Sequence, residues 1–169
     1  IRLVRHRAQE FGVKPDKIAV LGFSAGGHLV CTAATHYDAG DPAAVDPIDR
    51  ESCRPDLFVP CYAVASLTGF CNEGSKHSLL TKNTDPRQLR ALTAEFCVTE
   101  DTPPCFLWHT AEDGSVPVEN SLLFVQQLHR YGVACECHLF ESGRHGMSVA
   151  TREVDAASRA VHAWVGLCQ

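Results

Sequence analysis

The sequence predicts an α/β fold, in which a parallel sheet of about four strands is flanked by helices. Short apolar runs of strand length alternate with segments of helical periodicity along the whole chain. One of these runs passes through a glycine-bracketed turn directly into a helical segment. The length of 169 residues fits a single α/β domain over residues 1–169, since a domain near this size buries roughly 70% of its unfolded surface.

The composition is that of an ordinary globular domain and argues against nucleic-acid binding and against a membrane span. Hydrophobic residues make up 45% of the chain and charged residues 21%, and the net charge is -5. Acidic and basic residues are interspersed, without the basic stripe that nucleic-acid binding needs. No apolar run approaches the roughly 20 residues of a membrane span. We therefore expect neither a nucleic-acid partner nor a membrane span.

Nine cysteines are many for this length, and the number is odd. Their spacing contains no C-x-x-C pair, and Cys31, Cys61 and Cys105 fall within apolar segments, where a free thiol acts as a small hydrophobe. We expect reduced, mostly buried thiols and a reducing, cytoplasmic compartment. A zinc site is the alternative reading of these cysteines. Cys135 and Cys137 alternate along a strand and therefore face the same side.

The N-terminal part is expected to contain a helix, a strand, a helix and a strand, at residues 1–11, 17–22, 25–35 and 56–66. The first helix has no N-cap before it, so the chain is expected to begin inside an element. Such a start is also compatible with a targeting segment that has been removed. Residues 38–55 are rich in proline and acidic residues and predict a loop. Pro60 has no backbone N–H, so a bulge or strand end is expected near it.

The C-terminal part continues the alternation. A surface loop is expected over residues 67–84, because the segment has no clear period and many turn formers. The elements that follow are a helix at 85–94, strands at 104–110 and 133–140, and helices at 117–131 and 152–167. Within the helix at 117–131 the expected apolar stripe is Leu122, Val125 and Leu128.

Ser24 lies in Gly22-Phe23-Ser24-Ala25-Gly26, a G-x-S-x-G sequence that follows the apolar run 18–21 and precedes a helical stretch. This strand–turn–helix context is the one that a nucleophile elbow requires. A serine at such a turn has a strained backbone and a hydroxyl that stands clear of it. We expect Gly22 and Gly26 to be required there, because a Cβ would clash with the adjacent strand and helix.

Ser24, Asp113 and His145 occur in the chain order nucleophile, acid, base, and each comes directly after a predicted strand. A serine hydroxyl is a weak nucleophile until a base takes its proton, and the base needs an orienting acid. The carboxyl ends of parallel strands meet at one edge of the sheet. The sequence therefore predicts that these three side chains form a catalytic triad.

The acid and the base each have a competing candidate nearby. Glu112 adjoins Asp113, and only one of the two carboxylates can face the imidazole; Asp113 is preferred because it opens D-G-S-V-P before a helix. His109 ends a strand in apolar surroundings, which favours a histidine satisfied in the core or beside the site. His28 lies one turn into the helix after the elbow and is expected to pack or cap there.

The motifs GFSAGGHL, EDTPPCFLWHTAEDGSVPVENSLLF and ESGRHGM resemble those of the α/β-hydrolase superfamily, in its acetylxylan-esterase-like (BD-FAE-like) lipase/esterase branch. The resemblance implies Ser24 as nucleophile, Asp113 as acid, His145 as base and the backbone N–H of Ala25 as an oxyanion donor. It also implies that residues 68–78 overhang the pocket. The implied function is that of a serine carboxylesterase (a hydrolase of the EC 3.1.1 type) acting on small acyl esters, such as acetyl esters of sugars or xylan, without cofactor or metal.

The sequence departs from this family before the elbow. Members carry several strands there and a His-Gly-Gly loop that supplies a second oxyanion N–H, and no segment here matches them. We expect the C-terminal portion of an α/β-hydrolase fold whose first strand is an exposed edge, open to a second copy or to a complementing N-terminal half. Weak activity of the isolated chain is expected, since losing one oxyanion donor costs about 100- to 1000-fold in rate.

Two other functions compete with the esterase. A serine peptidase of the prolyl-oligopeptidase type shares the triad order, although such enzymes carry an aromatic residue where this chain has Ala25. A catalytically silent binding or assembly module would keep the fold without an activated serine. Labelling of Ser24 by a fluorophosphonate probe separates an enzyme from such a module.

Overall fold

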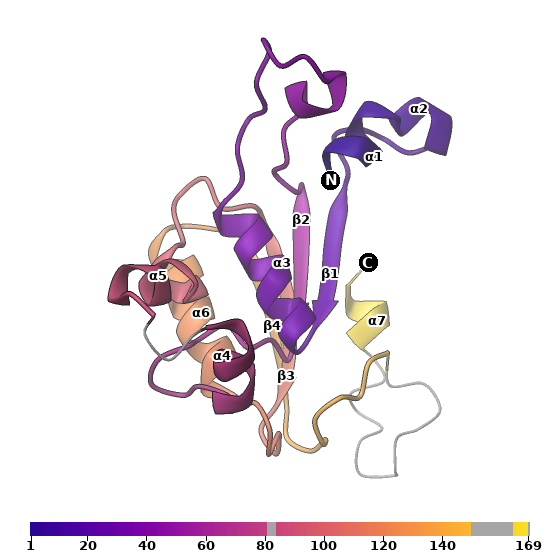
Figure 1. The fold of residues 1–169 in the computed structure, drawn as a ribbon. Coiled ribbons are helices and arrows are strands. Elements are labelled where there is room, and N and C mark those ends of the chain that lie inside the picture. The colour runs from indigo at the N-terminus through magenta and orange to yellow at the C-terminus, as the bar shows by residue number, and fades with distance from the viewer. Residues whose placement is uncertain (81–83, 150–163, 169) are drawn as a thin grey trace.

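A four-stranded parallel sheet forms the centre of the computed structural model, which describes residues 1–80, 84–149 and 164–168 (Figure 1). The strands lie in the order β1-β2-β3-β4, and each neighbouring pair is parallel. Their bounds are Ala19–Phe23, Leu57–Cys61, Cys105–Thr110 and Cys135–Phe140. The predicted α/β class and the four parallel strands are confirmed.

Two long helices, α3 (Ala25–Thr35) and α6 (Glu119–Arg130), pack on one face of the sheet. The residues after β4 and α7 (Trp164–Leu167) pack on the other. The shorter helices are α1 (Arg2–His6), α2 (Ala8–Phe11), α4 (Glu73–Leu79) and α5 (Pro86–Ala91), with 3-10 turns η1 (Pro47–Arg50) and η2 (Ala94–Phe96). No helix among the described residues is long and apolar enough to span a membrane.

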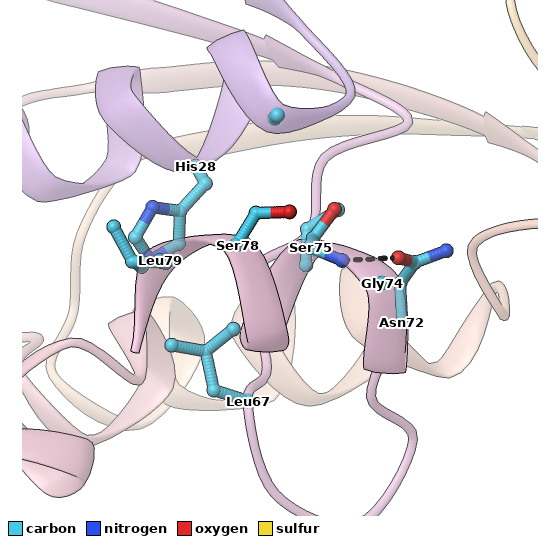
Figure 2. A pocket seen from close by; sticks show the side chains of 9 residues that line it. His28, Leu67, Asn72, Gly74, Ser75, Ser78 and Leu79 are labelled. Atoms are coloured by element: carbon cyan, nitrogen blue, oxygen red, sulfur yellow. Dashed lines mark hydrogen bonds between the residues drawn. The ribbon is translucent and has the colours of Figure 1, made fainter. Parts of the chain in front are cut away.

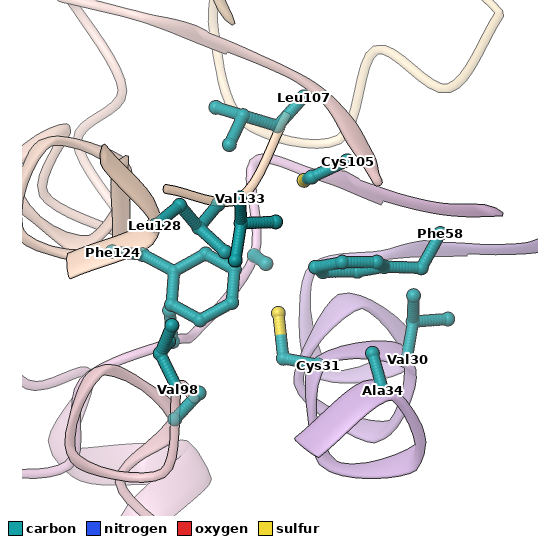
Figure 3. Packing of buried hydrophobic residues seen from close by; sticks show 13 residues of the cluster. Val30, Cys31, Ala34, Phe58, Val98, Cys105, Leu107, Phe124, Leu128 and Val133 are labelled. Carbon is teal, nitrogen blue, oxygen red and sulfur yellow. The ribbon is translucent and has the colours of Figure 1, made fainter. Parts of the chain in front are cut away.

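Alternate residues of the strands fill the two cores. Phe58, Cys105 and Leu107 point toward α3 and α6, where Phe58 meets Phe124 edge to face at 6.0 Å between ring centroids (Figure 3). The intervening Phe106 and Trp108 point to the opposite face. Burying each large apolar side chain contributes roughly 1.5–3 kcal/mol, so these layers hold the strand ends, and hence the site, in place.

The nine cysteines are free thiols in this structure, and three of them, at positions 31, 61 and 105, are buried. The other six are only half-buried, so the expectation of mostly buried thiols is wrong. Cys135 and Cys137 pack together against the core between the sheet and α6, as their alternation along β4 predicts.

The segment 67–84 contains helix α4, and the expectation of a loop throughout it is wrong. Asn72 caps the helix, its side chain accepting a hydrogen bond of 2.8 Å from the Ser75 N–H. None of the α4 residues is fully buried. A helix without a buried face carries no apolar period, which is why periodicity did not predict it.

The structure corrects two other expectations, the extent of the strand at 56–66 and the apolar stripe of the helix at 117–131. Pro60 lies in regular register with Gly22, so the strand end near it is confirmed at Cys61 but there is no bulge, and residues 62–66 continue outside the strand. Leu122 is 46% exposed, because α6 turns Phe124 and Leu128 into the core instead. The helix expected at 152–167 is described only as α7; residues 152–163 lie outside the described residues.

Candidate active site

Ser24 occupies the sharp turn between β1 and α3, with φ 54° and ψ -118°, a conformation that L-residues rarely adopt. Hydrogen bonds hold this backbone in place. The Ser24 N–H donates to the Cys61 carbonyl at 3.0 Å, and the Ser24 carbonyl accepts from the N–H groups of His28 and Val64 at 3.1 and 3.2 Å. The strained backbone predicted for a nucleophile elbow is therefore present. Hydrogen bonds with β2, with the chain just after it and with α3 hold it in place.

Two glycines make this turn sterically feasible, but they are not the two expected. A Cβ on Gly22 would overlap the Gly26 carbonyl and approach Val30 Cγ2 to 2.7 Å. A Cβ on Gly26 would meet nothing within 4 Å, whereas one on Gly27 would lie 2.5 Å from the Ala63 Cβ. The prediction is confirmed for Gly22 and wrong for Gly26, because Gly27 is the residue where α3 packs closely against the chain after β2.

The structure brings Ser24, His145 and Asp113 into one hydrogen-bonded chain. Ser24 Oγ lies 2.8 Å from His145 Nε2, and His145 Nδ1 lies 2.7 Å from Asp113 Oδ2. A carboxylate only accepts, so Nδ1 carries the proton and Nε2 is left to accept from the serine hydroxyl. Ser24 and His145 are 121 positions apart in sequence, and Asp113 and His145 are 32 positions apart.

Asp113 is held as an ionised carboxylate by its surroundings. Burial would raise its pKa, but hydrogen bonds from His109, the Val116 N–H, His145 and the Ser115 N–H outweigh burial and lower the pKa below its ordinary value. The two N–H groups lie 2.8 and 2.9 Å from Oδ1. Glu112, its neighbour, faces the Gly143 N–H at 3.4 Å instead, so Asp113 is the carboxylate that contacts His145.

The two rival histidines have other contacts. His28 Nε2 lies 2.8 Å from the Leu92 carbonyl, which fits the packing or capping role expected for it. His109 is fully buried, with Nδ1 2.8 Å from Ser121 Oγ and Nε2 3.0 Å from the Val116 carbonyl. Neither imidazole is hydrogen-bonded to Ser24 among these contacts.

Tyr62 belongs to the site and was not singled out from the sequence. Its ring contacts the His145 imidazole, and its hydroxyl accepts a hydrogen bond of 2.9 Å from the Ser148 N–H. The backbone of Tyr62 has φ 36°, which is unusual for a bulky residue. Its position directly after β2, at the same sheet edge as Ser24, is the signal that could have found it.

A cavity of about 540 Å³ adjoins the elbow. Ala25 and His28 of α3 line it from one side and Ser75, Ser78 and Leu79 of α4 from the other (Figure 2), together with Val64, Leu67, Asn72 and Gly74. The segment that the family resemblance placed over the pocket therefore does border it, as a helix rather than a loop.

The backbone N–H of Ala25 lies in the first turn of α3, where N–H groups have no acceptor within the helix. The positive end of the helix dipole favours negative charge at this point. This N–H lies next to the serine hydroxyl and the cavity. It suits the oxyanion of a tetrahedral intermediate formed at Ser24. Across residues 1–80, 84–149 and 164–168, no cluster of three or more His, Cys, Asp or Glu side chains is arranged to hold a metal ion.

Comparisons with known proteins relate this chain to esterases and xylan-degrading enzymes. An acetyl ester-xyloside bifunctional hydrolase from Caldicellulosiruptor lactoaceticus superposes with a TM-score of 0.93 at 48% identity, over 99% of this chain and 60% of that one. Endo-1,4-beta-xylanase B of Butyrivibrio fibrisolvens is 34% identical over 90% of this chain and 24% of its own length. Acetylxylan esterase of Xylanibacter ruminicola is 26% identical over 89% of this chain and 30% of its own length.

The chain thus spans about a quarter to a third of these curated relatives and 60% of the superposed structure. The fold of the structural neighbours is that of α/β-hydrolase esterases. The family model BD-FAE matches residues 1–128, and the chain belongs to the BD-FAE family.

Proposed function

We propose that the protein is a serine carboxylesterase that hydrolyses small acyl esters through an acyl-enzyme. The observation that carries this proposal is the hydrogen-bonded chain from Asp113 through His145 to Ser24 Oγ, and Ser24 is followed directly by Ala25 at the start of α3. A nucleophile, a base, an orienting carboxylate and an oxyanion donor are the parts that acyl transfer requires.

In the first half of the reaction Ser24 Oγ attacks the ester carbonyl while His145 Nε2 takes the hydroxyl proton. The carbonyl oxygen becomes an oxyanion that accepts from the Ala25 N–H. The imidazolium is stabilised by Asp113, which stays ionised because its pKa is lowered although burial would raise it. When the bond between the carbonyl carbon and the alcohol oxygen breaks, His145 returns the proton to that oxygen, and the alcohol leaves.

In the second half, water replaces the alcohol. His145 removes a proton from a water molecule as it attacks the acyl carbon, and the oxyanion forms again at the Ala25 N–H. The bond to Ser24 Oγ then breaks, His145 protonates the serine, and the carboxylic acid is released. The enzyme returns to its starting state with one ester bond hydrolysed and one water consumed.

The cavity holds the acyl side of the substrate in this proposal. The leaving alcohol must lie within reach of His145 Nε2, which protonates it. Over the described residues, the cavity lining includes Ala25 but not His145, so the cavity is placed for the substituent that points away from the imidazole. Its apolar floor of Val64 and Leu67 suits an alkyl group.

The alcohol side is proposed to be a sugar carrying acetyl groups, as on xylan. This rests on two relatives whose names are those of an acetylxylan esterase and of an acetyl ester-xyloside bifunctional hydrolase. Free thiols throughout the described chain support a reducing, cytoplasmic location.

We also propose that β1 pairs with a further strand. Among the described strands, β1 has a neighbour on one side only, β2, and Leu21 on it is 49% exposed. An edge strand presents unpaired N–H and C=O groups, which a second copy or a complementing N-terminal half would satisfy. Light scattering distinguishes these two alternatives, because only pairing with a second copy doubles the mass of the purified chain.

Hydrolysis of p-nitrophenyl acetate tests the esterase. Ser24→Ala should abolish turnover, while Ser52→Ala, a matched substitution in the loop 38–55 far along the chain from the elbow, should leave it unchanged. A fluorophosphonate probe should label the protein and the Ser52 variant but not the Ser24 variant. Equal turnover by the Ser24 variant, or no labelling of the folded protein, would reject the proposal, and the second result would favour a silent binding module.

A further inference from the structure

His109 lies in the core of the protein but contacts the carboxylate of Asp113. It lies on β3 with no exposed surface, and its Nε2 is 3.3 Å from Asp113 Oδ2. The same oxygen is 2.7 Å from His145 Nδ1. Two histidines, from β3 and from the loop after β4, therefore converge on a single carboxylate oxygen.

The tautomer of His109 follows from its neighbours. Nε2 faces two acceptors, Asp113 Oδ2 and the Val116 carbonyl at 3.0 Å, whereas Nδ1 faces the Ser121 hydroxyl at 2.8 Å. A bare nitrogen at Nε2 would point its lone pair at two oxygens in the buried core, with no hydrogen between them, which is strongly unfavourable. Nε2 therefore carries the proton, and the Ser121 hydroxyl donates to Nδ1.

These contacts fix the position of the Asp113 carboxylate. Oδ1 accepts from the N–H groups of Ser115 and Val116. Oδ2 accepts from His145 and lies 3.3 Å from His109 Nε2, whose N–H is shared with the Val116 carbonyl at 3.0 Å. The carboxylate has donors on both oxygens and cannot rotate without breaking several hydrogen bonds. Of the two histidines, His109 is the one with no exposed surface, whereas the His145 side chain is partly exposed.

We propose that His109 is a positioning residue for ester hydrolysis, holding Asp113 Oδ2 toward His145 and sharing that oxygen with it. The inference rests on the proposed function of Ser24, His145 and Asp113. Loss of the His109 N–H would have two effects. The carboxylate would be held less tightly, and Oδ2, relieved of one donor, would bind the protonated imidazole of His145 more strongly.

The second effect predicts a change in pH dependence. Among the residues that the structure describes, four other charged or titratable side chains lie near Asp113 and His145. His109 and Tyr62 approach from the core, Glu112 faces Gly143, and the Arg144 guanidinium lies against the His145 carbonyl at 3.1 Å. Since only the His109 contact is altered, the acid limb of the kcat/KM profile should move to higher pH when its donor is removed.

The experiment compares three variants on p-nitrophenyl acetate across pH. His109→Phe fills the same space without a donor, and His109→Gln keeps an N–H at the Nε2 position. Ser121→Ala is the control, because it removes the hydrogen bond on the other side of the ring and leaves the donor to Asp113. His109→Phe should lower kcat by roughly 10- to 100-fold, as expected when a catalytic group is slightly misplaced, with little change in KM.

The acid limb should move to higher pH in His109→Phe and return toward the wild-type position in His109→Gln. Ser121→Ala should lower the melting temperature but keep the acid limb in place. The inference is overturned if His109→Phe keeps the wild-type kcat and acid limb, or if Ser121→Ala moves the limb as far as His109→Phe does. If His109→Phe does not fold, His109→Met, which also lacks an N–H toward Asp113, is compared with Ser121→Ala and decides in the same way.

The proton NMR signal of His145 Nδ1–H is a readout that needs no turnover. The short contact with Asp113 should place it far downfield; Asp113→Asn should remove it, and His109→Phe should move it further downfield. An unmoved signal in His109→Phe contradicts the inference. Failure of the proposed function looks different, since Ser24→Ala would then keep wild-type turnover whatever happens at His109.

Discussion

The ring of Tyr62 stands edge-on to the imidazole of His145, with their centroids 5.0 Å apart and their planes at 75°. The tyrosine hydroxyl accepts from the Ser148 N–H, so one side chain joins the chain after β2 to the loop that carries His145. Tyr62 and Ser148 both have positive φ, 36° and 52°. Two strained residues linked by a hydrogen bond thus hold the loop around the proposed base.

Tyr62→Phe should slow ester hydrolysis without unfolding the protein. The ring and its contact with His145 remain, but the Ser148 N–H loses its acceptor, and the loop bearing the imidazole gains freedom. We expect kcat to fall by roughly 10-fold, since small displacements of a catalytic group are costly. Steady-state kinetics on p-nitrophenyl acetate measure it, with Tyr37→Phe, whose hydroxyl bonds to the Asp101 carbonyl, as the control. Equal losses in both variants would contradict a role specific to Tyr62.

The three glycines of the elbow should respond differently to alanine. At Gly22 and Gly27 a Cβ overlaps the Gly26 carbonyl or the Ala63 side chain, so each variant should lose about 1–3 kcal/mol of unfolding free energy, the usual cost of overpacking. Gly26→Ala places its Cβ in open space and should keep or raise stability. Urea unfolding of the three variants checks this order. A loss at Gly26 as large as that at Gly27 would refute the assignment.

Asp113→Asn should stop turnover and change stability in a pH-dependent way. An amide can present an N–H to His145 and favour the wrong tautomer, which costs about 10,000-fold in kcat in a serine hydrolase. Burial raises the pKa of Asp113, but its hydrogen bonds outweigh burial and lower it in the folded state. The carboxylate therefore stabilises the fold above the ordinary pKa of an aspartate, about 3.9, and this contribution is lost as pH falls below that value.

Thermal unfolding of wild type and Asp113→Asn measures the difference. At neutral pH the variant should be less stable, and the two melting temperatures should converge as the pH falls below about 4, where the unfolded-state carboxylate is protonated. Asp16→Asn, an exposed carboxylate remote from the site, serves as the control and should show no such convergence. A gap that widens toward acid would reverse the assigned sign.

Ser78→Phe should shorten the acyl group that the protein accepts. Ser78 lies on α4 at the cavity (Figure 2), and a benzyl group there would occupy space assigned to the acyl chain. We expect kcat/KM for p-nitrophenyl hexanoate to fall at least about 10-fold relative to the acetate, the scale on which pocket contacts discriminate. His77→Phe, next to it but outside the cavity lining, is the matched control. A parallel loss on both esters would place the acyl chain elsewhere.

Local sequence patterns predicted the parts of the site that depend on the chain near each residue. The apolar run before Gly22 and the helical stretch after it define a strand, a turn and a helix, and this is enough to locate Ser24. The order Ser24, Asp113, His145 could be read because parallel strands end at a common edge. Contacts of 2.8 and 2.7 Å between these side chains agree with that reading.

Contacts between distant segments decided the rest. Gly27 is needed only because Ala63, from the chain after β2, packs against it. Helix α4 has no buried face and depends on its Asn72 cap. Tyr62 looks like an ordinary core residue in the sequence, and only tertiary packing brings it against His145 from the loop after β4. His109 lies four residues before Asp113, and the turn after β3 brings these two side chains together.

The sequence by itself determined the order of the elements, the turn that strains Ser24 and the residues that meet at the sheet edge, because these follow from hydrophobic period and from the geometry of parallel strands. Tertiary structure alone decided which groups share Asp113 Oδ2 and which walls enclose the cavity beside Ala25. Hydrogen-bond partners and cavity walls depend on atoms a few ångströms apart in space but far apart in the chain, and no local pattern encodes that proximity.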